Sequence, residues 1–453
     1  MTLPPGVRGL VLAAVAAVVT SAGAVAVLLH PQDGTRKITG TVDAAPGLAW
    51  SVDAAERYGR ASAEFRDPVN GSEYGVDAAG FVDAGRTVVS MIGIPDDTHL
   101  RDPALIGIDA ETGATRWQVP ADGLVGCASA PVHGQLVCYT AERSTLVGFD
   151  IDSGTVTRTP VPWLVFGLAA VDDRVYTVEG DVESDDVRVH AGTLADPDAY
   201  WTRAFAMGTG WDDVADVLDV AHGQGTLEIG ADIAGFDLDT GAQTWTAPLG
   251  CGRATPTVGA LVVRTRTDCD DRLHTTVDIL DRTGRAIVTE VGADIRLPTL
   301  ERPADDTVPV LLADSAYDRR DGTLRWTSPD LAPGSPESDS TTVYVVGDVV
   351  LRHDAAARTL TALNLRTGQR LWRIETDRFG DVEASDGHTV VLRDATGLWA
   401  VERRTGETIW DIPFLAVNTD HDAFTGGGAL GVENDGRYLY AAPHTMIGLR
   451  PIR

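Results

Sequence analysis

The chain has 453 residues, with 66 Asp and Glu against 37 Lys and Arg, a formal net charge of −29 and an isoelectric point near 4.5. This negative charge argues against nucleic acid, or the surface of an anionic bilayer, as a partner. A chain of this length could form two or three ordinary domains, but one repeat runs through most of it, which predicts a single large array.

The N-terminus contains an uncharged apolar run. Residues 1–8 precede it, and the run itself extends from Gly9 to Leu29. A helix rises about 1.5 Å per residue and a hydrocarbon core is about 30 Å thick, so this run is long enough to cross a membrane. We expect an uncleaved transmembrane anchor with a short cytoplasmic tail, residues 1–8; a cleaved signal peptide is the alternative. Residues 30–45 are interpreted as a linker.

From residue 46 to residue 453 a short pattern returns about every 42 residues. Its first clear copy is Leu105–Trp117, in which apolar residues lead into an Asp, a Gly and, four residues later, a Trp. An Asp that starts a turn and a Gly in the left-handed conformation predict a tight β-hairpin with a bulge. The turn glycines are Gly113, Gly154, Gly241, Gly284, Gly322, Gly368 and Gly406, and the equivalent tryptophans are Trp117, Trp245, Trp326, Trp372 and Trp410.

The repeat predicts stacked β-sheet units with indole rings packed between neighbours. A degenerate copy, Asp196–Trp201, lies midway in the double interval between Gly154 and Gly241. The polar stretch 54–74 is interpreted as a loop insertion. Gly47–Val52 resembles the second half of a repeat and Thr445–Arg450 the first half, so we expect the two ends to pair and close a ring without exposed edges.

This consensus resembles the repeat of the quinoprotein-like β-propellers, Ala-x-Asp-x-x-Thr-Gly-x-x-x-Trp, over residues 46 to 451. The predicted fold is all-β: an eight-bladed, possibly nine-bladed, propeller closed by its terminal strands and preceded by one transmembrane helix. We favour eight blades, because the unit around Trp201 or the short unit before Gly322 need not form a full four-stranded blade. The family includes dehydrogenases that carry pyrroloquinoline quinone and non-enzymatic scaffolds such as the outer-membrane-assembly lipoprotein.

The four cysteines are expected to form two disulfides, Cys127 with Cys138 and Cys251 with Cys269. Each pair is placed almost symmetrically about a hairpin turn, near His133 for the first and near Gly259 for the second, so the two sulfurs can meet. Two disulfides would place the propeller outside the cytoplasm. Four buried free thiols are the alternative, and a metal site is disfavoured because no Cys-x-x-Cys spacing occurs.

One loop could hold a metal ion. Every second residue from Asn418 to Asp422 carries a side-chain oxygen, and the three side chains of Asn418, Asp420 and Asp422 could converge on a hard cation. A solvated loop explains these residues equally well and is preferred. No family active-site residue can be placed on this chain: it lacks the adjacent cysteine pair of many quinone-dependent dehydrogenases, and no Gly-x-Ser-x-Gly occurs.

The favoured function is therefore a non-enzymatic, membrane-anchored propeller outside the cytoplasm, without a cofactor, that binds a protein or glycan partner of the cell envelope. The alternative is a dehydrogenase that uses pyrroloquinoline quinone with calcium. A hydrolase or lyase acting on a carbohydrate is a third hypothesis, and two carboxylates facing one another across the funnel would be its signature.

Overall fold

The computed structural model describes residues 39–40, 45–72, 78–97, 99–140, 144–180, 186–207, 217–257, 260–267, 269, 275–291, 299–301, 305, 307–332, 341–378, 380–433 and 436–451. The expected anchor, residues 9–29, lies outside this set, together with the preceding tail and most of the linker. None of the helices in the described ranges combines the length and the apolar character that crossing a bilayer requires.

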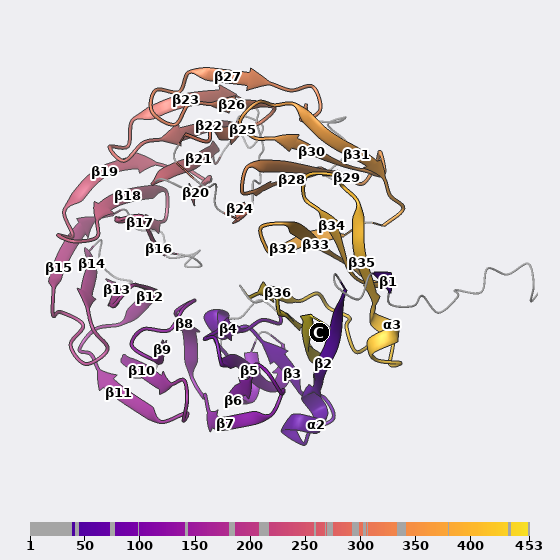
Figure 1. Cartoon of the computed structure of the whole chain (residues 1–453). Coiled ribbons are helices and arrows are strands. Elements are labelled where there is room, and N and C mark those ends of the chain that lie inside the picture. Colours follow the sequence, from indigo (N-terminus) through magenta and orange to yellow (C-terminus); the bar gives the residue numbers. More distant parts are fainter. Residues whose placement is uncertain are drawn as a thin grey trace, which may run out of the picture.

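The described strands form nine β-sheets that follow one another around a ring in chain order, and we call them blades 1 to 9 (Figure 1). The first four blades come from the first half of the chain. They consist of β3 (Glu64–Arg66), β4 (Val82–Asp83), β5 (Thr87–Asp96), β6 (His99–Asp109) and β7 (Thr115–Pro120); β8 (Leu124–Cys127), β9 (Gln135–Thr140), β10 (Thr145–Asp150) and β11 (Val156–Pro160); β12 (Val165–Val171), β13 (Arg174–Gly180), β14 (Asp186–Gly192) and β15 (Trp201–Ala206); and β16 (Leu218–Ala221), β17 (Gln224–Ile229), β18 (Asp232–Asp237) and β19 (Gln243–Pro248).

Blades 5 to 8 come from the second half of the chain. They consist of β20 (Arg253–Thr257), β21 (Leu261–Thr267), β22 (Thr275–Leu280) and β23 (Ala286–Val291); β25 (Val310–Leu312), β26 (Ser315–Tyr317) and β27 (Leu324–Thr327); β28 (Thr341–Val346), β29 (Val349–Asp354), β30 (Thr359–Asn364) and β31 (Arg370–Glu375); and β32 (Asp381–Ser385), β33 (Thr389–Asp394), β34 (Gly397–Glu402) and β35 (Thr408–Pro413).

Blade 9 joins the two ends of the propeller. It contains β36 (Ala429–Val432), β37 (Tyr438–Ala441), β38 (Thr445–Pro451) and, from the other end of the chain, β2 (Pro46–Asp53). β2 and β38 are antiparallel, with Pro46 opposite Pro451 and Asp53 opposite Thr445. The predicted pairing of the terminal strands is therefore confirmed.

The prediction of eight blades is wrong, and the alternative of nine is correct for the described strands. The degenerate unit around Trp201 forms a full four-stranded blade, blade 3. The short unit before Gly322 forms blade 6, which has three strands in the described part of the chain. The strand that precedes it in the chain, β24 (Thr299–Glu301), pairs in parallel with β28 of blade 7, so it does not complete blade 6.

The chain also forms several short elements in addition to the main blade strands. β1 (Thr39–Gly40) pairs antiparallel with the outer strand β35 of blade 8. The interpretation of residues 54–74 as a loop is wrong in part: this stretch contains the helix α2 (Ala54–Tyr58), the strand β3 and the 3₁₀ helix η1 (Pro68–Asn70). The Asp53 carboxylate caps α2 by accepting the Glu56 N–H at 2.7 Å. Another short helix, α3 (Phe414–Val417), follows blade 8.

The indole rings of the repeat lock neighbouring blades together. The Trp117 side chain of blade 1 lies against the turn glycine of blade 2, so that a Cβ added to Gly154 would sit 2.8 Å from the ring. The Trp117 indole N–H also donates to the Ile151 carbonyl oxygen at 2.8 Å. The same donor and acceptor positions pair Trp50 with Ala110, Trp201 with Leu238, Trp326 with Leu365 and Trp372 with Arg403, at 2.9 to 3.0 Å.

The lock is incomplete at the boundary between blades 4 and 5. The turn that ends in Gly284 is one residue shorter than the turn that ends in Gly113, and the missing residue is the one that carries the acceptor carbonyl elsewhere. The Trp245 ring still covers Gly284, but its buried N–H has no hydrogen-bond partner among the described residues. Blades 2 and 5 carry Arg158 and Val288 in place of the tryptophan.

Candidate functional site: the turn face

In blades 1 to 8 the last two strands are joined by a short connection, which is a tight turn in seven blades and an eight-residue loop in blade 3. These eight turns lie at the same end of every blade because each blade repeats the same strand order. We call this end of the ring the turn face. Its turns are residues 109–113, 150–154, 193–200, 237–241, 281–284, 318–322, 364–368 and 402–406.

The first Asp of the turn holds the backbone in place. In blade 1 the Asp109 carboxylate accepts hydrogen bonds from the Thr112 hydroxyl at 2.8 Å and from the Thr112 N–H at 3.0 Å, while the Gly113 N–H donates to the Asp109 carbonyl at 2.9 Å. The hydrogen bond from the Thr112 hydroxyl lowers the pKa of Asp109. Asp150 and Asp237 make equivalent contacts in blades 2 and 4. The role of these aspartates is therefore to stabilise the turn backbone.

The residue two positions after that Asp points outward. In blade 1 the intervening Ala110 is 3 % exposed, whereas Glu111 is exposed. The turns of blades 1 to 4 each carry two carboxylates and no cation, and the turns of blades 5 to 8 each carry at least one arginine. The two halves of the propeller differ in the same sense. Residues 46–250 contain 33 Asp and Glu and 11 Arg, a formal charge of −22. Residues 251–453 contain 31 Asp and Glu and 23 Arg, a formal charge of −8.

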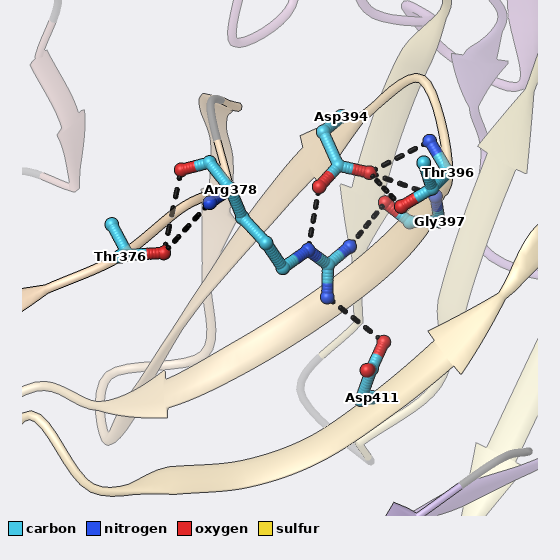
Figure 2. Close-up of polar contacts among 6 residues, drawn as sticks. All are labelled: Thr376, Arg378, Asp394, Thr396, Gly397 and Asp411. Atoms are coloured by element: carbon cyan, nitrogen blue, oxygen red, sulfur yellow. Dashed lines mark hydrogen bonds and ion pairs between the residues drawn. The ribbon is translucent and has the colours of Figure 1, made fainter. Parts of the chain in front are cut away.

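The opposite end of blade 8 carries a polar cluster around Arg378 (Figure 2). The Arg378 guanidinium donates to Asp394 at 2.5 Å, to Asp411 at 2.9 Å and to the Gly397 carbonyl at 3.4 Å, and it lies 5.1 Å from the centre of the Trp399 ring. Burial alone would raise the pKa of Asp394, but hydrogen bonds from Arg378 and Thr396 outweigh it and lower the pKa. The cluster ties the chain entering blade 8 to that blade, so we interpret it as structural.

The boundary between blades 2 and 3 is held without an indole lock. Leu194 of blade 3 lies over Gly148 of blade 2, where an added Cβ would be 2.2 Å from the leucine. His190 of blade 3 stacks on Trp163 with ring centres 4.1 Å apart. Its two nitrogens lie 2.7 Å from Asp198 and 3.0 Å from Glu179. The imidazole therefore links the Glu179 and Asp198 side chains within blade 3.

The candidate metal ligands lie in an exposed loop after α3. The Asn418 side-chain oxygen accepts the Asp420 N–H and the Asp420 carboxylate accepts the Asp422 N–H, both at 3.0 Å. These contacts are those of successive turns. Over the described residues, no three His, Cys, Asp or Glu side chains gather in a way that could hold a metal ion.

Both predicted disulfides are present. Cys127 and Cys138 join β8 to β9 in blade 2, where the two residues are direct cross-strand partners with Cα atoms 3.9 Å apart. Cys251 and Cys269 join the residues flanking β20 and β21 in blade 5, with Cα atoms 5.1 Å apart. The first pair is buried, while the second is exposed. The alternative of four free thiols is excluded.

The family model described as outer membrane protein assembly factor BamB matches residues 35–268 and 312–419, well over half of the chain. The chain belongs to this family. The match covers blades 1 to 4 completely and most of blades 6 to 8, and it confirms the resemblance to the quinoprotein-like repeat. Among curated proteins, none matches the chain.

Several solved structures are similar. BamB from Moraxella catarrhalis is 20 % identical, covering 83 % of this chain and 96 % of that one, with a TM-score of 0.38. A europium-containing methanol dehydrogenase is 12 % identical, covering 88 % and 85 %, with a TM-score of 0.42. The computationally designed protein Ika8 is 13 % identical, covering 84 % and 99 %, with a TM-score of 0.45.

The alternative hypothesis of a quinone-dependent dehydrogenase requires ligands for calcium and a surface for the quinone. Within the described ranges no cluster of metal-ligating side chains is present, and all four cysteines form disulfides between residues distant in sequence.

The division of charge on the turn face was missed by the sequence analysis. The signal was present, because the residue two positions before the turn Gly changes from acidic to basic between the repeats ending in Gly241 and Gly284. It becomes meaningful only when the turns are known to share one face of a ring.

Proposed function

We propose that this protein is a membrane-anchored propeller outside the cytoplasm that binds a protein partner in the cell envelope. The observation that carries the proposal is its membership of a family described as an outer membrane protein assembly factor, which spans most of the ring. The structure supports a scaffold role because the blades fix the connections at both ends of the ring, and preorganised loops lose little conformational freedom on binding.

The compartment follows from two features. The disulfides in blades 2 and 5 favour an oxidising environment, which the cytoplasm does not provide. The uncharged run from Gly9 to Leu29 precedes the propeller and supplies a candidate anchor. Together they support a propeller held at a membrane on its outer side.

The single lysine of the chain, Lys37, allows a direct test of the topology, because it lies between the apolar run and the propeller. A membrane-impermeant amine reagent applied to intact cells should label the wild-type chain and not a Lys37→Arg variant. Labelling only after the cells are lysed would contradict the proposal. Labelling of both chains would report a new amino terminus outside the membrane, and hence a cleaved signal peptide in place of an anchor.

The partner can be sought with a photo-reactive residue placed at either end of the ring. Arg320 is an exposed turn residue of blade 6, and Val291, which is 77 % exposed, lies at the opposite end of blade 5. We expect irradiation of intact cells to give a product with another envelope protein from one of these two positions and a much weaker one from the other. The scaffold role would be rejected by equal products from both positions, or by no product with a different protein from either.

A further inference from the structure

The turn face carries an arc of exposed carboxylates and an arc of exposed arginines, each spanning four blades, and the turns of blades 5, 6 and 8 hold carboxylates beside their arginines. The carboxylate arc comprises one exposed acidic residue from each of blades 1 to 4, Glu111, Asp152, Asp196 and Asp239. The arginine arc comprises one exposed arginine from each of blades 5 to 8, Arg282, Arg320, Arg366 and Arg404. Blade 9 separates the arcs on one side, because its last two strands come from opposite ends of the chain and no turn joins them.

This arrangement is self-complementary under a two-fold rotation. Consider a second copy placed face to face with the first, with the axis lying in the interface and passing through blade 9. In a ring of nine blades, this rotation places blade 1 of one copy over blade 8 of the other, blade 2 over blade 7, blade 3 over blade 6 and blade 4 over blade 5. Every carboxylate turn therefore meets an arginine turn, and each contact occurs twice, as in an isologous interface.

We propose that the turn face is a homodimer interface in which the carboxylate arc of one copy contacts the arginine arc of the other. The proposed register pairs Glu111 with Arg404 and Asp152 with Arg366. In the same register Asp196 pairs with Arg320, and Asp239 with Arg282. The partner is a second copy of this chain, so the inference goes beyond the proposed function and does not depend on it.

Side chains of both arcs form ion pairs within one copy, and these ion pairs are weak enough to be replaced by contacts with a second copy. Arg404 lies 2.8 Å from Asp348, and Arg366 lies 2.8 Å from Asp305. In the carboxylate arc, Asp152 lies 3.1 Å from Arg116 and is 78 % exposed. Ion pairs near the surface contribute little to stability, so association can share or replace them.

The net charge of −29 on each copy opposes association at long range. Salt screens this repulsion over a Debye length of about 8 Å at 0.15 M ionic strength, while charges in direct contact across an interface are screened less. The dimer is therefore expected at physiological salt and is weakened at low ionic strength.

The register is tested by reversing charges and then restoring them. Mass is measured by light scattering across a range of concentrations, with the full chain purified in 0.15 M salt. Each single reversal, Glu111→Arg or Arg404→Glu, creates two like-charge contacts per dimer and should raise the dissociation constant about tenfold or more. The double variant carrying both changes should return to the wild-type value. A mismatched double variant, Glu111→Arg with Arg366→Glu, should not.

Chemical cross-linking gives an independent test, because the chain has only one lysine. A carbodiimide joins an amine to a carboxylate in direct contact, with loss of water. In an Arg404→Lys variant it should produce a covalent dimer in which position 404 is linked to Glu111 of the other copy. In an Arg366→Lys variant the link should be to Asp152. The link from position 404 to Asp348 within one copy forms no dimer and serves as the internal control.

Three results would overturn the proposal. The first is a monomer at every concentration with unchanged folding of the wild-type chain. The second is a dimer that the matched double variant does not restore, and the third is a covalent dimer linked through other carboxylates. The melting temperature of each variant, measured alongside, should stay at the wild-type value because every altered side chain is exposed.

Discussion

Seven blades of the propeller carry a tryptophan on the outer strand, and the two that do not are the two that carry the disulfides. Blades 2 and 5 have Arg158 and Val288 at the tryptophan position. Blade 2 contains Cys127–Cys138 and blade 5 contains Cys251–Cys269. The tryptophans and the disulfides act differently, because an indole ring joins one blade to the next, whereas each disulfide joins two residues of the same blade. The comparison indicates that a blade without the outer-strand tryptophan is stabilised by a disulfide inside the blade.

The largest effect is expected in blade 5, at the buried ion pair that accompanies its disulfide. Asp278 is 1 % exposed and accepts hydrogen bonds from Arg264 at 2.7 Å, Arg266 at 3.0 Å and Thr289 at 2.6 Å. An Asp278→Asn variant should lose about 4 kcal/mol of unfolding free energy at pH 7, because it leaves a buried guanidinium without its counter-charge. Denaturant unfolding measures the loss, and Asp377→Asn, in an exposed pair with Arg358, should change stability by less than about 0.5 kcal/mol.

The stability difference between the wild type and Asp278→Asn should depend on pH. Burial would raise the pKa of Asp278, but hydrogen bonds from Thr289 and Arg264 outweigh it and lower the pKa in the folded state. The stability that the carboxylate contributes is therefore complete above the unfolded pKa of about 3.9 and is lost as the pH falls through the lower folded value. The difference between wild type and Asp278→Asn should shrink in acid. A difference that stays constant down to pH 2.5 would contradict this assignment.

Removal of a disulfide is expected to have the next largest effect. The double variant Cys127→Ser with Cys138→Ser should lose about 3 kcal/mol of unfolding free energy, because the unfolded chain is no longer cross-linked. Reductant should lower the melting temperature of the wild type and change the variant less. The exposed pair Cys251–Cys269 should be reduced in the folded protein, whereas the buried pair should resist until blade 2 opens. Equal reduction rates would count against this difference.

A glycine substitution tests the indole lock itself. Gly154 has φ +70° and faces the Trp117 ring, whereas Gly134 has φ +74° and no heavy atom within 4 Å of an added Cβ. Both substitutions to Ala strain the backbone, but only Gly154→Ala also pushes into the indole. It should cost about 2 kcal/mol more than Gly134→Ala in thermal or denaturant unfolding. Equal losses would show that contact with the ring does not constrain this turn.

The smallest effect compares two tryptophans that differ by one hydrogen bond. Trp117→Phe removes an indole N–H bound to the Ile151 carbonyl, while Trp245→Phe removes an N–H that lacks a partner in the described part of the chain. The two residues are 7 % and 6 % exposed, so the loss of buried ring area is similar. Trp117→Phe should cost about 1 kcal/mol more than Trp245→Phe. The reverse order would refute the role given to the shortened turn before Gly284.

Much of this architecture could be predicted from the sequence, because the repeat fixes local geometry. The Asp-to-Gly turn, the indole position, the disulfide partners and the pairing of β2 with β38 all follow from residues close together in the repeat or from its two incomplete halves. The number of blades did not follow, because the sequence does not show that the degenerate unit around Trp201 and the short unit before Gly322 each form a sheet of their own. Long-range contacts decide this, and they also pair β24 with blade 7, which leaves blade 6 with three described strands. The three-residue strand β3 was missed because it is shorter than the roughly four to eight residues over which strand alternation can be recognised.

The candidate site was less predictable than the fold. Asn418, Asp420 and Asp422 form an alternating acidic pattern, yet the first two accept backbone N–H groups of their own loop, which the spacing alone does not distinguish from metal ligation. The opposite charges of Glu111 and Arg404 become a surface feature only once blades 1 and 8 are placed on either side of blade 9.

The difference between the two kinds of blade is tested most directly by hydrogen exchange of backbone amides, measured by mass spectrometry before and after reduction of the disulfides. We predict that reduction increases exchange first in blades 2 and 5, at β8, β9, β20 and β21, while blades 1, 7 and 8 keep their protection. An increase spread evenly over all nine blades, or one that begins in the blades with tryptophan, would contradict the account.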